Sequence, residues 1–102
     1  MENIDYNAAL DIYTHGISQP GEYKYVDTDG NIFYCKNGKR HREDGPAIVY
    51  KCGTRKWYVN GKFHNECGPA IIWDGGDEYY YLNGQEVSKQ EFMEQKLLNL
   101  MA

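Results

Sequence analysis

The stretch from Trp57 to Trp73, which reads W-Y-V-N-G-K-F-H-N-E-C-G-P-A-I-I-W, decides the fold. Its parts recur 23 residues away along the chain. Asn-Gly pairs begin at Asn37, Asn60 and Asn83, and Gly-Pro-Ala runs begin at Gly45 and Gly68. A fixed period in this range is typical of repeat architectures, in which similar units stack and bury a shared core.

Each copy of the period is interpreted as a β-hairpin. Glycine supplies the positive φ of a tight turn, and glycines recur between β-prone runs at Gly30, Gly53 and Gly76. The runs are rich in β-branched and aromatic residues, as strands are. The predicted strand pairs are Tyr23–Val26 with Ile32–Cys35, Ala47–Tyr50 with Lys56–Val59, and Ala70–Trp73 with Glu78–Leu82. The polar connectors between hairpins are Lys39–Asp44 and Lys62–Cys67.

The predicted fold class is an all-β repeat, with hairpins stacked in a single elongated antiparallel sheet and a C-terminal capping α-helix. One domain spans the whole chain. Residues 1–22 are expected to form an N-terminal cap or a decayed repeat, with a short helix from Asn3 or Asp5 to Tyr13. Residues 23–87 then form three 23-residue hairpin repeats, and residues 88–102 form the C-terminal helix.

The C-terminal helix has a clear start signal. Ser88 and Glu91 have the spacing of a capping box, in which each side chain accepts a hydrogen bond from the other residue's backbone. The helix is predicted to run from Lys89 to Leu100. It is expected to cover the open end of the stack, because exposed sheet edges invite aggregation. Alternatively, it pairs with another copy of the chain.

The bulk composition allows one domain with a modest core. The chain has 102 residues, of which 41% are hydrophobic, and a mean hydropathy of −0.77. No apolar run approaches the roughly 18 residues of a membrane span, and the N-terminus lacks the features of a signal peptide. The cysteines, Cys35, Cys52 and Cys67, are odd in number and have no tight pairing motif. Reduced thiols and a cytoplasmic location are therefore expected.

The net charge of −4 conceals a basic central segment. Eight of the eleven lysines and arginines lie between Lys36 and Lys62, where only Glu43 and Asp44 oppose them. Such a segment attracts an anionic partner, unless its lysines and arginines are simply solvated turn residues. Basic and tryptophan residues together form the predicted partner-binding set: Lys39, Arg40, His41, Arg42, Arg55, Trp57 and Trp73.

Two more residue types recur at the 23-residue spacing and could take part in acid–base chemistry. His41 and His64 occupy equivalent positions, as do Glu43 and Glu66, so they form either a row of acid–base pairs or a structural element of each copy. No C-x-x-C or H-x-x-x-H spacing supports a metal site. Cys67 lies three residues from His64, but an exposed connector offers no walls to exclude water from a nucleophile. We expect no enzyme activity, no metal and no cofactor.

The motif W-Y-x-N-G-K-x-H-x-x-x-G-P-A and the 23-residue period resemble MORN repeats, over residues 24–84. The likeness is to a divergent variant found in small phage and large-virus proteins. It departs from the usual pattern where Gly-Pro-Ala replaces Gly-x-Gly. The resemblance implies a scaffold of stacked two-stranded hairpins that supports protein association, sometimes with phospholipid binding proposed, and it does not imply catalysis.

The predicted function is non-catalytic protein binding through the sheet face and the basic connector. In a viral setting, the resemblance implies a small phage or viral protein that inhibits or sequesters a host defence factor in the host cytoplasm. A nucleotide or nucleic-acid binding module is the alternative, because basic residues beside aromatic ones suit phosphate contact and stacking. A structural protein that self-associates through the C-terminal helix is the second alternative. The sequence leaves open which sheet face is exposed.

Overall fold

The computed structural model describes residues 2–4 and 21–101. Its elements, in chain order, are β1 (Glu2–Ile4), β2 (Glu22–Val26), β3 (Ile32–Lys36), β4 (Lys39–Arg40), β5 (Ile48–Val49), β6 (Arg55–Lys56), β7 (Tyr58–Val59), β8 (Lys62–Phe63), β9 (Ile71–Ile72), β10 (Glu78–Leu82), β11 (Gln85–Val87) and α2 (Lys89–Met101).

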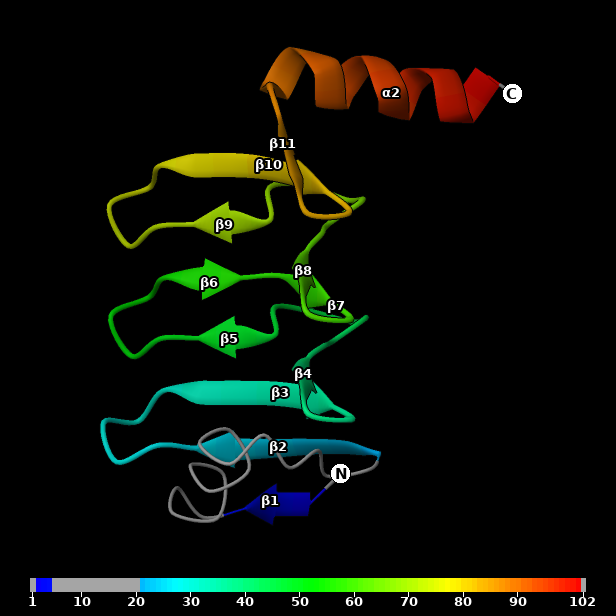
Figure 1. Ribbon diagram of the computed structural model, residues 1–102. Coiled ribbons are helices and arrows are strands. Elements are labelled where there is room, and N and C mark those ends of the chain that lie inside the picture. Colours follow the sequence, from blue (N-terminus) through cyan, green and yellow to red (C-terminus); the bar gives the residue numbers. More distant parts are fainter. Residues whose placement is uncertain (1, 5–20, 102) are drawn as a thin grey trace.

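The strands form a ladder with the helix at its C-terminal end (Figure 1). Strand order in the main sheet is β1-β2-β3-β5-β6-β9-β10-β11, with β4 added beside β3 and a separate pair formed by β7 and β8. All pairings are antiparallel except that of β1 with β2. The predicted, mostly antiparallel β-sheet with one C-terminal helix is confirmed.

Two adjacent rows of side chains across the sheet differ in burial, whereas the sequence left open which face is exposed. Directly opposed residues share a face, and one row across six strands consists of Tyr25, Phe33, Ile48, Lys56, Ile71 and Tyr79. We call this side the inner face, because it carries the buried side chains of Tyr25, Ile48 and Ile71. The adjacent row lies on the outer face, has no buried member and consists of Val26, Ile32, Val49, Arg55, Ile72 and Glu78.

Turn geometry recurs at the 23-residue spacing. The residues Asn37, Asn60 and Asn83 have φ values of 51°, 52° and 52°. Asparagine tolerates this left-handed conformation better than most residues, and the glycine that follows adopts it without strain. Backbone bonds recur too: the N–H of Tyr34 donates to Ala47 O, and the N–H of Trp57 donates to Ala70 O, both at 2.7 Å.

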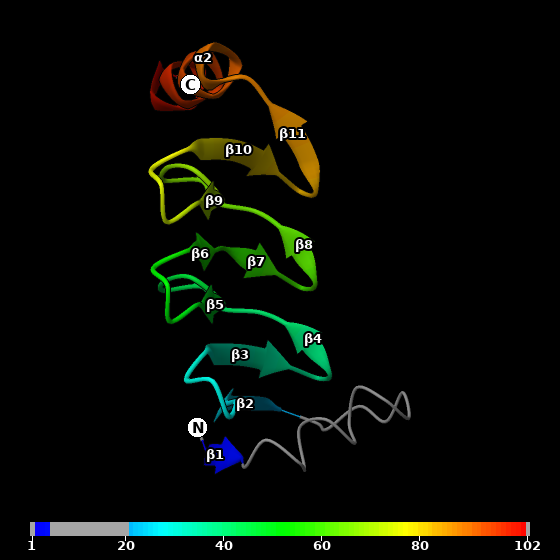
Figure 2. The same cartoon turned by 90° about the vertical axis from the view of Figure 1, so that its left-hand side faces the viewer.

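The predicted strand Lys56–Val59 is interrupted at Trp57. β6 ends at Lys56 in the main sheet, whereas β7 begins at Tyr58 and pairs with β8. The first residues of each predicted polar connector are also strand, because the Asn-Gly turn folds the chain back on itself. Figure 2 shows the resulting strands β4, β8 and β11 one above another along one side of the ladder.

The C-terminal helix begins where the capping box placed it. The N–H of Glu91 donates to Ser88 Oγ at 3.0 Å, and the N–H of Ser88 donates to Glu91 Oε1 at 3.3 Å. Phe92 is buried, with its ring centroid 4.9 Å from that of Tyr80. At the other end of the chain, a helix starting at Asn3 is wrong, because Glu2–Ile4 is strand β1. The rest of the predicted N-terminal helix and cap lies outside the described residues.

Candidate protein-binding surface

The two connector histidines perform the same structural task. His41 Nδ1 accepts the backbone N–H of Asn60, and His64 Nδ1 accepts that of Asn83, both at 2.9 Å. Each histidine therefore holds the Asn-Gly turn that follows it. His41 is only 5% exposed, so it offers almost no surface to a partner, although it belongs to the predicted binding set. The glutamates Glu43 and Glu66 lie 3.8 Å and 3.4 Å from the respective Nε2 atoms.

Arg42 is also occupied within its own connector. Its Nε donates to Asp44 Oδ1 at 2.8 Å, and its Nη1 donates to the Pro46 carbonyl at 3.2 Å. The guanidinium carbon lies 4.0 Å from the ring centroid of Tyr34, in cation–π range. The hydrogen bond from Arg42 and its positive charge lower the pKa of Asp44 below its ordinary value. One period later Asn65 replaces Arg42, and its Nδ2 donates to the Pro69 carbonyl at 2.8 Å.

The remaining basic residues of the predicted set are dispersed. The Lys39 stem lies beside the Gly61 turn, where an added Cβ would be 3.5 Å from Lys39 Cδ. The Arg40 guanidinium carbon is 4.9 Å from the Phe33 ring centroid, on the inner face. Arg55 is exposed in the outer row. The structure therefore does not gather these side chains into one basic patch.

The two tryptophans belong to opposite faces. Lys56 Nζ lies 5.1 Å from the Trp73 ring centroid and 5.3 Å from that of Tyr50, so Trp73 is on the inner face. Trp73 is 41% exposed. Trp57 lies between the two connectors and borders two hollows, one of which includes the outer-face residue Ile72.

Trp57 lies at the centre of the hollowed surface formed by the connectors. Two adjoining cavities of about 340 Å³ and 450 Å³ share Trp57, Glu43, Asn65 and Cys67 as lining residues. We call them together the Trp57 groove. Its apolar lining is completed by Val59, Pro69 and Ile72. An indole beside aliphatic side chains in a concave surface is typical of a protein-binding anchor site.

The rim of this groove is acidic. The side chains of Glu43, Asp44 and Glu66 are 76%, 86% and 79% exposed, and all three line the groove. Arg42 is the basic residue of the lining, and its charge is balanced by Asp44. The groove thus presents a net negative rim, whereas the sequence predicted a basic one. The repeated glutamates were visible in the sequence, but the ion pair that neutralises Arg42 was not.

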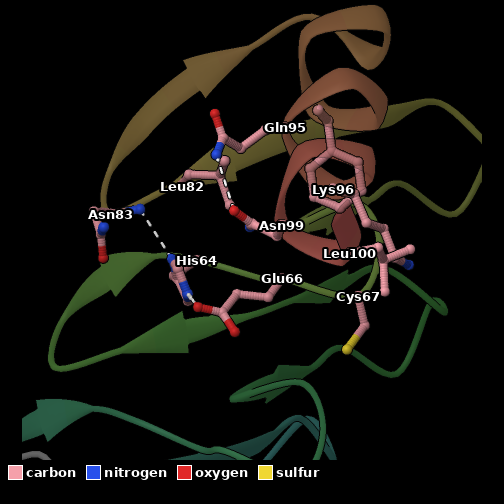
Figure 3. A pocket seen from close by; sticks show the side chains of 10 residues that line it. His64, Glu66, Cys67, Leu82, Asn83, Gln95, Lys96, Asn99 and Leu100 are labelled. Carbon is pink, nitrogen blue, oxygen red and sulfur yellow. Dashed lines mark hydrogen bonds and ion pairs between the residues drawn. The ribbon is translucent and has the colours of Figure 1, made fainter. Parts of the chain in front are cut away.

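A third hollow of about 410 Å³ continues the connector surface toward α2 (Figure 3). His64, Glu66 and Cys67 border it from the connector side, while Lys96 and Asn99 border it from the helix. His64 has neither nitrogen available to activate the Cys67 thiol, because Nδ1 accepts from Asn83 and Nε2 faces Glu66. The geometry gives no support to a cysteine–histidine nucleophile.

Within residues 2–4 and 21–101, no group of three or more histidine, cysteine, aspartate or glutamate side chains is arranged to hold a metal ion. No helix in this part of the chain is long and apolar enough to cross a membrane. No protein-family model, curated protein or solved structure matches the sequence or the fold. The resemblance to MORN repeats therefore stays a prediction.

Proposed function

We propose that the chain is a non-catalytic protein-binding module built from three stacked, MORN-like hairpin copies. The recurrence of equivalent contacts supports the repeat description. The histidine-to-turn bonds from Asn60 and Asn83 have the same length, and the Asn-Gly turns have nearly identical φ values. Copies that stack in this way leave a continuous side surface, which solenoid proteins use for binding.

The Trp57 groove is the proposed contact site. The observation that carries the proposal is the half-buried Trp57 in a concave, partly apolar surface, bordered by the exposed carboxylates of Glu43 and Glu66. Tryptophan is over-represented among residues that dominate binding energy, and surrounding charges select the partner's sign. The partner segment therefore carries an apolar side chain flanked by lysine or arginine. A host defence factor as the partner follows only from the resemblance to phage and viral proteins.

The nucleotide-binding alternative is less well supported. Phosphate would approach the acidic rim of Glu43, Asp44 and Glu66 against an unfavourable field. Lys56 Nζ already lies over the rings of Tyr50 and Trp73, and Lys24 Nζ lies 5.8 Å from the ring centroid of Tyr34. A rise in melting temperature with mono-, di- or cyclic nucleotides, and none with peptides, would favour that alternative.

The test is binding of the full chain to a peptide array that varies charge around a central leucine or phenylalanine. We expect retention on peptides with flanking lysine or arginine, and at least about a tenfold loss for Trp57→Ala. Trp73→Ala is the matched control, because it removes the same side chain from the other face. Because Trp57→Ala also perturbs packing, the exposed pair Glu43→Lys with Glu66→Lys provides a second variant. Preference for acidic peptides, or equal loss from both tryptophan variants, would refute the assignment.

A further inference from the structure

The C-terminal helix α2 does not contact the rest of the chain through its most apolar side. Phe92 is its one buried residue among the described positions. The side chains of Gln95, Lys96 and Asn99 line the cavity between the helix and the connector, and so does that of Leu100, as Figure 3 shows. A helix whose only purpose was to cap the sheet would bury an apolar stripe. Here three polar side chains lie on the side that faces the chain, beside the buried Phe92 and the edge of Leu100, which is itself 77% exposed.

The apolar side chains of α2 are left exposed. Met93, Leu97, Leu100 and Met101 are 47%, 58%, 77% and 75% exposed. Their spacing of four, three and one residues places them along one side of a helix with about 3.6 residues per turn. The spacing of Met93, Leu97 and Leu100 is that of alternating d, a and d positions in a coiled coil.

We propose that this stripe pairs with the same stripe of a second copy, forming a parallel two-helix coiled coil. The inference goes beyond peptide binding at the Trp57 groove, because it uses a different surface. With Leu97 at position a, Lys89 and Lys96 fall at g and Glu94 falls at e. These are the positions whose charges set partner and orientation in coiled coils.

The charges favour a second copy in the parallel orientation. In a parallel pair, a g residue faces the e residue of the following heptad on the partner helix. Lys89 therefore lies opposite Glu94 of the second copy, and the two-fold symmetry of the dimer gives two such pairs. An antiparallel pair would instead set g positions against each other and bring lysines together. The helix charges of Lys89, Glu91, Glu94 and Lys96 also sum to zero. Two copies of a chain with net charge −4 can therefore approach here without local repulsion.

The length of the apolar stripe limits the affinity of the proposed dimer. Thirteen helical residues span about 20 Å, which is fewer than two heptads. The contact is smaller than the roughly 800 Å² per partner of a standard stable complex. The association is therefore a reversible monomer–dimer equilibrium in the micromolar to millimolar range rather than an obligate dimer.

Sedimentation equilibrium of the full chain, from about 10 μM to about 1 mM, tests the proposal. We expect a concentration-dependent dimer and a weakening of at least about tenfold for Leu97→Gln. Leu98→Gln is the matched control, because Leu98 is equally exposed, at 61% against 58%, but lies outside the stripe. A monomer at every concentration, or equal effects of the two variants, would overturn the proposal.

Exchanging the charges at Lys89 and Glu94 tests whether the two helices of the dimer are parallel. Lys89→Glu is expected to weaken the dimer without loss of helix, because a carboxylate is favoured in the first helical turn. The double variant Lys89→Glu with Glu94→Lys is expected to restore it. A dimer that Lys89→Glu strengthens would overturn the parallel arrangement. A chain that stays monomeric but binds phosphatidylcholine vesicles through Leu97 would show that the stripe meets lipid rather than a second copy.

Discussion

Substitution of the connector histidines measures how much the histidine-to-turn bond stabilises the fold. The perturbation is His41→Ala, which removes the acceptor of the Asn60 N–H at 2.9 Å. Because His41 is 5% exposed, water cannot easily replace the lost acceptor. The Asn60 N–H is only partly buried, so its lost bond costs the lower part of the range of about 1–3 kcal/mol for an unsatisfied donor, and the cavity left by the buried ring adds to that cost. We expect a total loss of about 2–4 kcal/mol of unfolding free energy.

Two further variants separate the hydrogen bond from simple packing. In His41→Asn, the amide oxygen can take the place of Nδ1, whereas in His41→Gln the amide occupies the position of Nε2. Nε2 has no hydrogen-bond partner among the described residues, so its loss costs little. His41→Asn is therefore expected to recover about 1 kcal/mol or more relative to alanine, and His41→Gln is expected to recover less.

The matched site is His64, which makes the same bond to Asn83. Its side chain is 15% exposed, against 4% for that of His41, so water can partly satisfy the freed N–H. His64→Ala is expected to cost about 1–2 kcal/mol. Urea unfolding followed by circular dichroism gives these differences as shifts in midpoint at constant m-value. If His41→Ala cost no more than His64→Ala, or glutamine rescued as well as asparagine, the reasoning would be refuted.

Three other predictions concern local structure. Asp27 Oδ1 accepts the N–H groups of Asp29 and Asn31, both at 2.9 Å. Burial raises the pKa of Asp27, but the hydrogen bonds from Asn31 and the neighbouring backbone outweigh it and hold the pKa below its ordinary value. The carboxylate therefore stabilises the fold fully above its ordinary pKa and loses this effect as pH falls through the lowered pKa; Asp27→Ala should flatten this part of the acid-unfolding curve measured by fluorescence. Ser88→Ala is expected to cost about 1 kcal/mol and to fray the first turn of α2, seen as reduced ellipticity, while Ser88→Asp retains the cap. Gly61→Ala, at φ +81°, should cost about 1 kcal/mol or more in urea unfolding. Gly75→Ala, with no positive φ and nothing within 4 Å of an added Cβ, should be neutral or slightly stabilising.

Much of the local structure was readable from residue types. The strand pairs follow from β-prone runs around Gly30, Gly53 and Gly76, and each of these glycines has positive φ. The start of α2 follows from Ser88 and Glu91. These features depend on contacts within a few residues, so sequence order is enough to predict them. The extra strand pairing after each Asn-Gly turn was missed because two-residue strands such as Lys39–Arg40 are too short for a periodic signal.

The candidate site required tertiary structure. The sequence indicated Trp57 and the adjacent connectors, but it presented Lys39, Arg40, His41 and Arg42 as one basic cluster. In the fold, His41 is buried, Arg42 is paired with Asp44, and Arg40 lies over Phe33. Each of these contacts depends on the direction of a side chain relative to a neighbouring strand or turn.

The sequence by itself determined the spacing of turns, the strand-forming segments and the helix cap, because backbone conformation responds to nearest neighbours. Only the tertiary structure decided which rows of the sheet are buried and which charges remain available. It brought Asn60 to His41 across 19 residues and placed Trp57 and Trp73 on opposite faces. The charge that a site presents to a partner depends on which side chains form ion pairs, such as Arg42 with Asp44. A count of lysines and arginines along the sequence does not reveal these pairs.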